Sequence, residues 1–155
     1  MSRHTSFSIG GPADVFVQPA TREEIRSAVY CAKEAGIPFF VMGNGSNLLV
    51  SDEGFRGMII QIGKNFQAIS VKDTVIEVQA GALLSRTARA AWNAGLTGFE
   101  FAAGIPGTTG GAVAMNAGAY GGEIKDVLLD AQVLTQDGEF LTLTAEELEL
   151  SYRHS

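Results

Sequence analysis

The chain has 155 residues, which is enough for one domain with a sizeable core, and its 46% hydrophobic and 18% charged residues are typical of a globular protein. A net charge of −6 without any basic cluster argues against a nucleic-acid or membrane-surface partner. The single cysteine, Cys31, excludes an internal disulfide framework, and His4 and His154 stand at opposite ends without a cysteine beside them, so no metal site is predicted.

Targeting and membrane segments are not visible in the sequence. No apolar run approaches the length of a membrane span, and the first residues lack the apolar segment of a signal peptide. These observations predict a soluble, cytoplasmic protein. We expect a monomer, although composition does not determine the oligomeric state.

The first predicted elements are a short strand and a helix. Residues 13–18 predict a strand that Pro19 ends. Thr21 and Glu24 form a capping box for the helix that follows, in which apolar residues recur at helical spacing from residue 25 to residue 35. Gly36 suits the end of this helix. Cys31 lies beside the apolar stripe with no identifiable basic partner that would activate its thiol, so we predict no catalytic role for it.

A strand at 39–42 leads into a first glycine stretch, Gly43-Asn44-Gly45-Ser46-Asn47, and residues 48–50 are predicted to be extended. It is not a Rossmann fingerprint, because Leu48 stands at the third glycine position, and it is not a Walker A loop, because it has no lysine. If phosphate binds here, backbone amides must hold it, with help from the side chains of the stretch. The alternative is an ordinary Asn-Gly turn between strands.

The middle of the chain predicts a strand, a hairpin and a helix. Residues 57–62 predict the strand, and 68–71 with 74–79 predict a hairpin around Lys72-Asp73. The helix is predicted over 82–94, where Leu84, Ala88, Ala91 and Trp92 share one face. We expect Trp92 in the core rather than stacked on a ligand.

A second glycine stretch, Gly104 to Gly122, contains seven glycines in nineteen residues and no charged residue. Its apolar residues distinguish it from a flexible linker, and buried glycines usually permit a close approach or a positive φ. Residues 109–116 predict one or two helical turns. A loop that enters a helix presents free amides and the positive end of a dipole, so we predict a pocket for a phosphate-carrying ligand. The alternative is a turn that only lets two elements pack closely.

The last part of the chain predicts two strands and a short helix. Strands at 127–135 and 140–143 flank the turn Gln136-Asp137-Gly138, and Thr144 with Glu147 form a capping box for a helix through Leu148. The chain stops abruptly after residue 155, which suggests a piece of a larger protein. Several strands with two well-formed helices predict the α+β class.

Four segments carry a family resemblance in their order and spacing, namely residues 4–14, 43–47, 104–121 and 152–155. Together they resemble the UDP-N-acetylenolpyruvoylglucosamine reductase family, flavoenzymes of bacterial peptidoglycan synthesis, over essentially the whole chain. The resemblance implies an α+β, PCMH-type FAD-binding domain of two small subdomains, about 1–65 and 66–155, with the flavin between them. The family's C-terminal substrate-binding domain is absent from the chain, so we expect an FAD-binding fragment that is incomplete for catalysis.

The resemblance also implies the cofactors and their site. FAD is the implied cofactor and NADPH the implied reductant. The first glycine stretch is implied to wrap the FAD pyrophosphate, and part of the second to line FAD further along. The implied cofactor-binding residues are Gly43, Asn44, Gly45, Ser46, Asn47, Gly104, Ile105, Pro106, Gly107, Thr108, Thr109, Gly110, Gly111, Ala112, Asn116 and Gly118. Thr108 stands where family members often carry a smaller residue, which should not disturb binding through the backbone.

In this family, NADPH reduces FAD, and hydride then passes to the double bond of a UDP-sugar enolpyruvyl ether. The anionic intermediate beside the substrate carboxylate needs a cation and then a proton. Arg153 matches the family arginine that stabilises this intermediate, which makes it the implied catalytic residue, and Arg153 with Tyr120 are the implied substrate-binding residues. The family's serine proton donor and glutamate have no assigned positions in this chain, and Ser155 is not given that role.

Two other functions stay open. One is a different PCMH-type FAD oxidoreductase; a covalent-flavin oxidase of this kind usually has a His or Cys beside the ring, and we expect no histidine near either glycine stretch. The other is a non-catalytic module that binds FAD or a nucleotide. A serine and a glutamate in a downstream substrate domain would favour the reductase.

Overall fold

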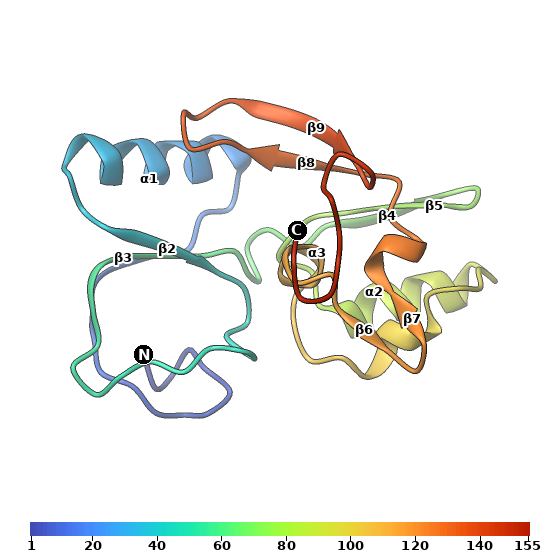
Figure 1. The fold of residues 1–155 in the computed structure, drawn as a ribbon, viewed down its shortest axis with the longest axis horizontal. Coiled ribbons are helices and arrows are strands. Elements are labelled where there is room, and N and C mark those ends of the chain that lie inside the picture. Colours follow the sequence, from blue (N-terminus) through green and yellow to red (C-terminus); the bar gives the residue numbers. More distant parts are fainter.

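The computed structural model describes residues 1–155 and has an α+β architecture, as the sequence predicted (Figure 1). None of its helices has the length and the apolar composition that a membrane span needs. The elements in chain order are β1 (Ala13–Val17), α1 (Arg22–Glu34), β2 (Phe39–Met42), β3 (Phe55–Gln61), β4 (Ile69–Lys72), β5 (Val75–Val78), α2 (Leu84–Asn93), the 3₁₀ turn η1 (Glu100–Gly104), α3 (Thr109–Ala114), β6 (Gly118–Ala119), β7 (Gly122–Glu123), the 3₁₀ turn η2 (Ile124–Asp126), β8 (Asp130–Leu134) and β9 (Phe140–Thr144).

Figure 1 shows two halves side by side, and we call them the α1 half (β1, α1, β2 and β3) and the α2 half (β4 to β7, α2 and α3). The α1 half is built on a parallel sheet in the order β1-β3-β2. The predicted cap of α1 forms, because the Thr21 hydroxyl accepts from the Glu24 amide at 3.1 Å. Val29 and Ala32 of α1 pack on Ile60 of the central strand, which is fully buried, so one face of the sheet is closed by the helix.

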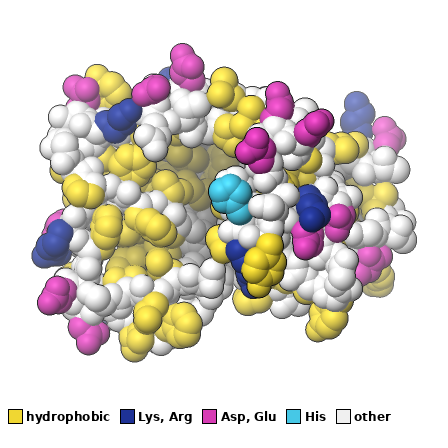
Figure 2. All heavy atoms as spheres, in the orientation of Figure 1, with side chains coloured by type: hydrophobic (Ala, Val, Ile, Leu, Met, Phe, Trp, Pro, Cys, Tyr) yellow, Lys and Arg dark blue, Asp and Glu magenta, His cyan; other side chains and the backbone are white.

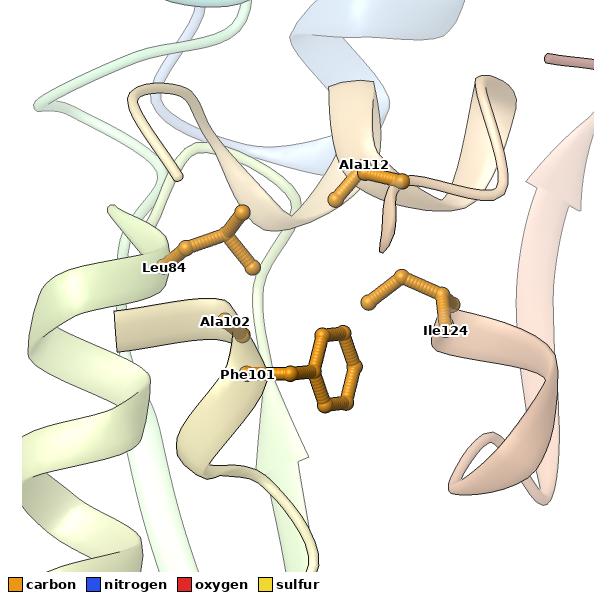
Figure 3. Packing of buried hydrophobic residues seen from close by; sticks show 6 residues of the cluster. Leu84, Phe101, Ala102, Ala112 and Ile124 are labelled. Atoms are coloured by element: carbon orange, nitrogen blue, oxygen red, sulfur yellow. The ribbon is translucent and has the colours of Figure 1, made fainter. Parts of the chain in front are cut away.

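The α2 half has its own core. Leu84 of α2 and Ala112 of α3 meet Phe101 of η1 and Ile124 of η2, and Figure 3 shows these side chains directed toward one another. Four short elements thus share one cluster, which fixes the start of α2 relative to α3. The second glycine stretch runs through this cluster, so its geometry depends on packing as well as on its glycines.

Both predicted hairpins are present. β4 and β5 pair antiparallel around a turn in which Asp73 adopts a φ of 53°, and β8 pairs with β9. In Figure 1 the β8–β9 hairpin starts from the α2 half and runs along α1. Figure 2 shows that the surface is hollowed between the two halves, with hydrophobic side chains gathered on the α1 half beside the hollow.

Two local predictions near the ends of elements were wrong. Residues 48–50 form no strand; Leu48 and Val50 instead pack against a small third cluster that contains Met42 and Ile59. The Thr144–Glu147 capping bonds form, at 2.8 and 3.2 Å, but residues 145–149 make turns rather than a helix. Starting a helix is unfavourable, and each further helical residue offsets this by adding a hydrogen bond. A segment of one turn has too few such residues.

Trp92 was predicted to be a core residue and is instead 68% exposed. The buried stripe of α2 contains Leu84, Thr87 and Ala91, and residue 92 follows about 100° further round the helix. The guanidinium carbon of Arg89 lies 4.5 Å from the Trp92 ring centroid, so a cation covers part of the exposed ring.

Candidate functional site

The two glycine stretches lie in direct contact, although about 60 residues separate them in the sequence. The Ser46 hydroxyl donates to the Pro106 carbonyl at 2.9 Å, and the two residues are 60 positions apart in the sequence. Gly43 lies against Thr108, so closely that a Cβ at residue 43 would stand 2.2 Å from Thr108 Oγ1. Glycine at 43 is therefore required by the approach of the second stretch. The structure thus brings the two stretches that were predicted to bind phosphate into contact.

Seven backbone amides at this contact have no acceptor within the chain. They are the amides of Gly43 to Asn47 in the first stretch and those of Gly107 and Thr108 in the second. An unpaired N–H group is a strong donor that seeks an acceptor, and successive free amides in turn conformation form an anion-binding concavity. Neither stretch contains a lysine or arginine. The site can therefore hold an anion through neutral donors alone.

The first turn of α3 contributes no free amide, which differs from the predicted anion site at a helix start. The amide of Thr109 donates to Ala82 O at 2.8 Å, and that of Gly110 donates to Ala80 O at 2.9 Å. The Gly111 amide donates to the capping hydroxyl of Thr108 at 3.4 Å. The free amides thus precede the helix. FAD contacts from residues 109–112 stay a prediction.

The N-terminal segment of the chain packs directly against the first glycine stretch. Gly45 has a φ of 65°, and a Cβ there would stand 2.2 Å from the backbone oxygen of His4. The Ser6 amide donates to Gly45 O at 3.1 Å. The expectation that no histidine lies near a glycine stretch is therefore wrong for His4, which reaches the stretch through its backbone oxygen. The centroid of its ring lies 4.1 Å from the centroid of the Phe16 ring.

Asn116 joins the end of α3 to two other segments. Its side-chain nitrogen donates to Glu123 Oε2 at 2.8 Å and to Ser151 O at 3.2 Å, and its side-chain oxygen accepts from the Lys125 amide at 3.0 Å. The residue is 4% exposed and has a φ of 40°, a left-handed conformation that asparagine tolerates better than most residues. All three bonds are internal to the chain. A contact of Asn116 with FAD stays a prediction.

Arg153 lies on a turn that is tied to α3. Ser151 and His154 exchange two backbone bonds of 3.1 Å, and the Ser155 hydroxyl donates to Ala114 O at 3.0 Å. The Arg153 side chain is exposed and forms no ion pair. It lines a cavity of about 240 Å³ together with Gly118 and Asn116. Tyr120, at 99% exposure, does not line this cavity.

Comparison with known proteins identifies the family of this site. Residues 13–144 match the family model described as the FAD binding domain. The chain belongs to the FAD binding domain family. A relative from Alkaliphilus metalliredigens, UDP-N-acetylenolpyruvoylglucosamine reductase, is 55% identical over the whole chain, which covers 51% of that protein. The predicted resemblance to that reductase family is thereby confirmed.

Solved structures agree with the predicted FAD-binding fold. The crystal structure of UDP-N-acetylenolpyruvylglucosamine reductase from Thermus caldophilus matches with a TM-score of 0.84 at 40% identity, over 99% of this chain and 53% of that one. 6-Hydroxy-D-nicotine oxidase from Arthrobacter nicotinovorans matches with a TM-score of 0.71 at 15% identity, over 88% of this chain and 31% of that one, which shows a shared fold alone. The chain spans about half the length of the curated relatives it matches.

Sequence reasoning missed the backbone groups that hold the second glycine stretch in this FAD binding domain. The carbonyls of Ala80 and Ala82 accept from the start of α3, and a Cβ on Gly110 would stand 2.7 Å from the Cβ of Ala80. Residues 80–82 therefore support the second glycine stretch through hydrogen bonds and close packing. Carbonyl groups occur in every residue, so no side-chain pattern could have marked these positions. The structure gathers no group of three His, Cys, Asp or Glu side chains suited to a metal ion.

Glu123 is predicted to make the free energy of unfolding of this FAD binding domain depend on pH. Hydrogen bonds from Lys125 and then from Asn116 lower the pKa of Glu123 below its usual value. A carboxyl with a lowered pKa in the folded state stabilises the fold above its unfolded-state pKa and loses this contribution as the pH falls through the folded-state value. We expect Glu123→Gln to reduce the loss of unfolding free energy between about pH 5 and pH 3.

Urea unfolding at both pH values measures this effect. Glu77→Gln on β5 is the matched control, because the Glu77 carboxylate makes no hydrogen bond or ion pair. Equal acid sensitivity in Glu123→Gln and the unchanged chain would contradict the prediction.

Proposed function

We propose that the chain is the FAD-binding part of a UDP-N-acetylenolpyruvoylglucosamine reductase, which reduces UDP-N-acetylglucosamine enolpyruvate to UDP-N-acetylmuramate with NADPH as reductant. The observation that carries the proposal is the set of seven unpaired amides where the two glycine stretches meet. Relatives of that name over the whole chain support the choice of substrate. The proposal places the protein in the cytoplasm as a monomer that serves peptidoglycan synthesis, and hence cell shape and division.

The site fits a large ligand with a pyrophosphate group. The close approaches at Gly43 and Gly45 leave no room for side chains, so the backbone itself forms the surface. Amides from both stretches can reach one pyrophosphate because Ser46 and Pro106 hold the stretches together. In the proposal, FAD lies between a subdomain of residues 1–65 and one of residues 66–155. Bound FAD supplies the hydride carrier between NADPH and the substrate.

Arg153 is proposed to bind the substrate carboxylate. Its guanidinium group has no ion-pair partner in the chain, and its turn is fixed to α3 by Asn116 and Ser155. A planar guanidinium pairs bidentately with a carboxylate and keeps its charge, so it can also stabilise negative charge that develops on the substrate. Tyr120 is exposed and is proposed to contact the UDP-sugar.

Flavin binding by the purified chain tests the proposal. We expect the visible flavin band to stay with the protein through gel filtration after FAD is added, and FAD to raise the melting temperature because it binds the folded state only. Riboflavin, which has no pyrophosphate, is the control and is expected to separate from the protein. A folded chain that stays colourless in excess FAD would overturn the proposal.

A further inference from the structure

The β8–β9 hairpin takes part in the cores of both halves. Leu134 near the tip of the hairpin packs against the cluster of Val29, Ala32, Met58, Ile60 and Ile62 in the α1 half. Leu128, just before β8, packs against the cluster around Leu84 in the α2 half. Figure 1 shows the hairpin leaving the α2 half and crossing to α1. It therefore connects the two halves separately from the contact between the glycine stretches.

Polar contacts fix the tip of the hairpin to the C-terminal end of α1. The Lys33 ammonium donates to Gln136 O at 2.6 Å and lies 3.2 Å from Asp137 Oδ1. A charge-assisted bond of this kind is stronger than a neutral one. Beneath the tip is a cavity of about 490 Å³, which Lys33, Arg26 and Asp137 help to line. The Lys33 contacts therefore act together with the packing of Leu134 to hold the tip.

Aromatic contacts fix the other strand of the hairpin. The guanidinium carbons of Arg22 and Arg26 lie 5.2 and 5.8 Å from the ring centroid of Phe140. Both distances are within the range in which a cation is attracted to an aromatic face. Arg22 also donates to Gln132 Oε1 at 3.4 Å. One face of α1 is thus attached to the hairpin from its first residue to Lys33.

We propose that the β8–β9 hairpin is a strut that sets the distance between the two glycine stretches, and that Lys33 and Phe140 are positioning residues for FAD binding. The inference rests on the FAD binding proposed above. A pyrophosphate must meet amides from both stretches at once, so its affinity depends on their separation. The two halves also meet at Gly43 and Thr108 and through Ala80, which packs against the Val29 cluster, and the attachment of the hairpin to α1 adds a further contact that restricts their relative motion.

Variants of the two positioning residues test the strut. We expect Lys33→Met and Phe140→Ala each to weaken FAD binding about threefold, and the double variant about tenfold. Lys33→Arg keeps a donor to Gln136 O and is expected to restore most of the affinity. Lys72→Met on β4 is the matched control for loss of a charge, because Lys72 makes no hydrogen bond or ion pair.

A purely structural role is tested with a variant that destabilises the protein elsewhere. Ala88→Gly lies within α2, outside the hairpin and α1, and lowers helix stability because glycine has a lower helix propensity than alanine. If it weakens FAD binding as much as Lys33→Met does, the effect is general destabilisation and the strut is overturned. FAD affinities equal to that of the unchanged chain in both hairpin variants would also overturn it.

The separation of the glycine stretches can be measured without FAD. Nitroxide labels at Leu49→Cys and Ala103→Cys, both exposed positions, report this distance once the exposed Cys31 is replaced by serine. We expect the distance distribution to broaden in the Lys33→Met Phe140→Ala variant, and an unchanged distribution would overturn the strut. A chain that ignores FAD would overturn the proposed function and the strut's part in FAD binding, while the labels would still report the geometry.

Discussion

Replacing Gly43 by alanine is expected to weaken FAD binding about 10- to 100-fold, because overpacking of a closed contact costs about 1–3 kcal/mol. The new Cβ would stand 2.2 Å from Thr108 Oγ1 and 3.2 Å from both Thr108 Cβ and Cγ2. Thr108 is 3% exposed and caps α3, and its β-branched side chain has few rotamers, so it cannot turn away cheaply. The two glycine stretches must then separate, and one pyrophosphate no longer reaches both sets of amides. Fluorescence titration with FAD measures the effect.

A second substitution distinguishes this contact from a general defect. Thr108→Ala in the same chain removes Oγ1 and Cγ2, the atoms that meet the new methyl group, and is expected to restore much of the affinity. Gly63→Ala is the control, since its Cβ would meet only the Gln61 side chain, at 3.7 Å or more. Wild-type FAD affinity in Gly43→Ala would contradict the account of the site.

Leu84→Ala is expected to lower the free energy of unfolding by about 2–5 kcal/mol, the usual effect of removing a buried leucine side chain. Leu84 is 1% exposed and packs with Phe101 and Ala112 in the core of the α2 half (Figure 3). Its amide donates to Gly107 O at 3.1 Å, so the cavity would also loosen the second glycine stretch. Urea unfolding should show a lower midpoint with an unchanged slope.

Leu49→Ala is the matched control for this prediction. Leu49 is 68% exposed, so the same substitution there is expected to change the unfolding free energy by no more than about 0.5 kcal/mol. Similar midpoints for the Leu84 and Leu49 variants would contradict the assignment of the second core.

The sequence predicted the elements whose signals are local. Thr21 and Glu24 begin α1 and Gly36 follows its end, because capping and a left-handed residue act within one helical turn. Trp92 was placed wrongly because it lies at the border of the buried stripe of α2. Whether a residue at such a border is buried depends on the neighbouring elements, which the helix's own sequence does not specify. Residues 48–50 were placed wrongly because an apolar run also suits a loop that covers a small cluster.

The residues of the candidate site could be predicted from the family resemblance, but their arrangement could not. Nothing in the sequence relates Ser46 to Pro106 or Gly43 to Thr108, since these contacts follow from the packing of two separate halves. Asn116 illustrates the same limit. The family resemblance implied that Asn116 contacts FAD, and only the fold shows that its side-chain amide joins Glu123, Lys125 and Ser151.

Amide NMR shifts during an FAD titration test the central claim most directly, because the claim concerns particular backbone N–H groups. We predict that FAD shifts the amide signals of residues 43–47, 107 and 108, whereas riboflavin, which lacks the pyrophosphate, leaves them in place. The amides of Thr109 and Gly110, already bonded to Ala82 and Ala80, should move less. FAD that binds without shifting residues 43–47, 107 and 108 would contradict the account.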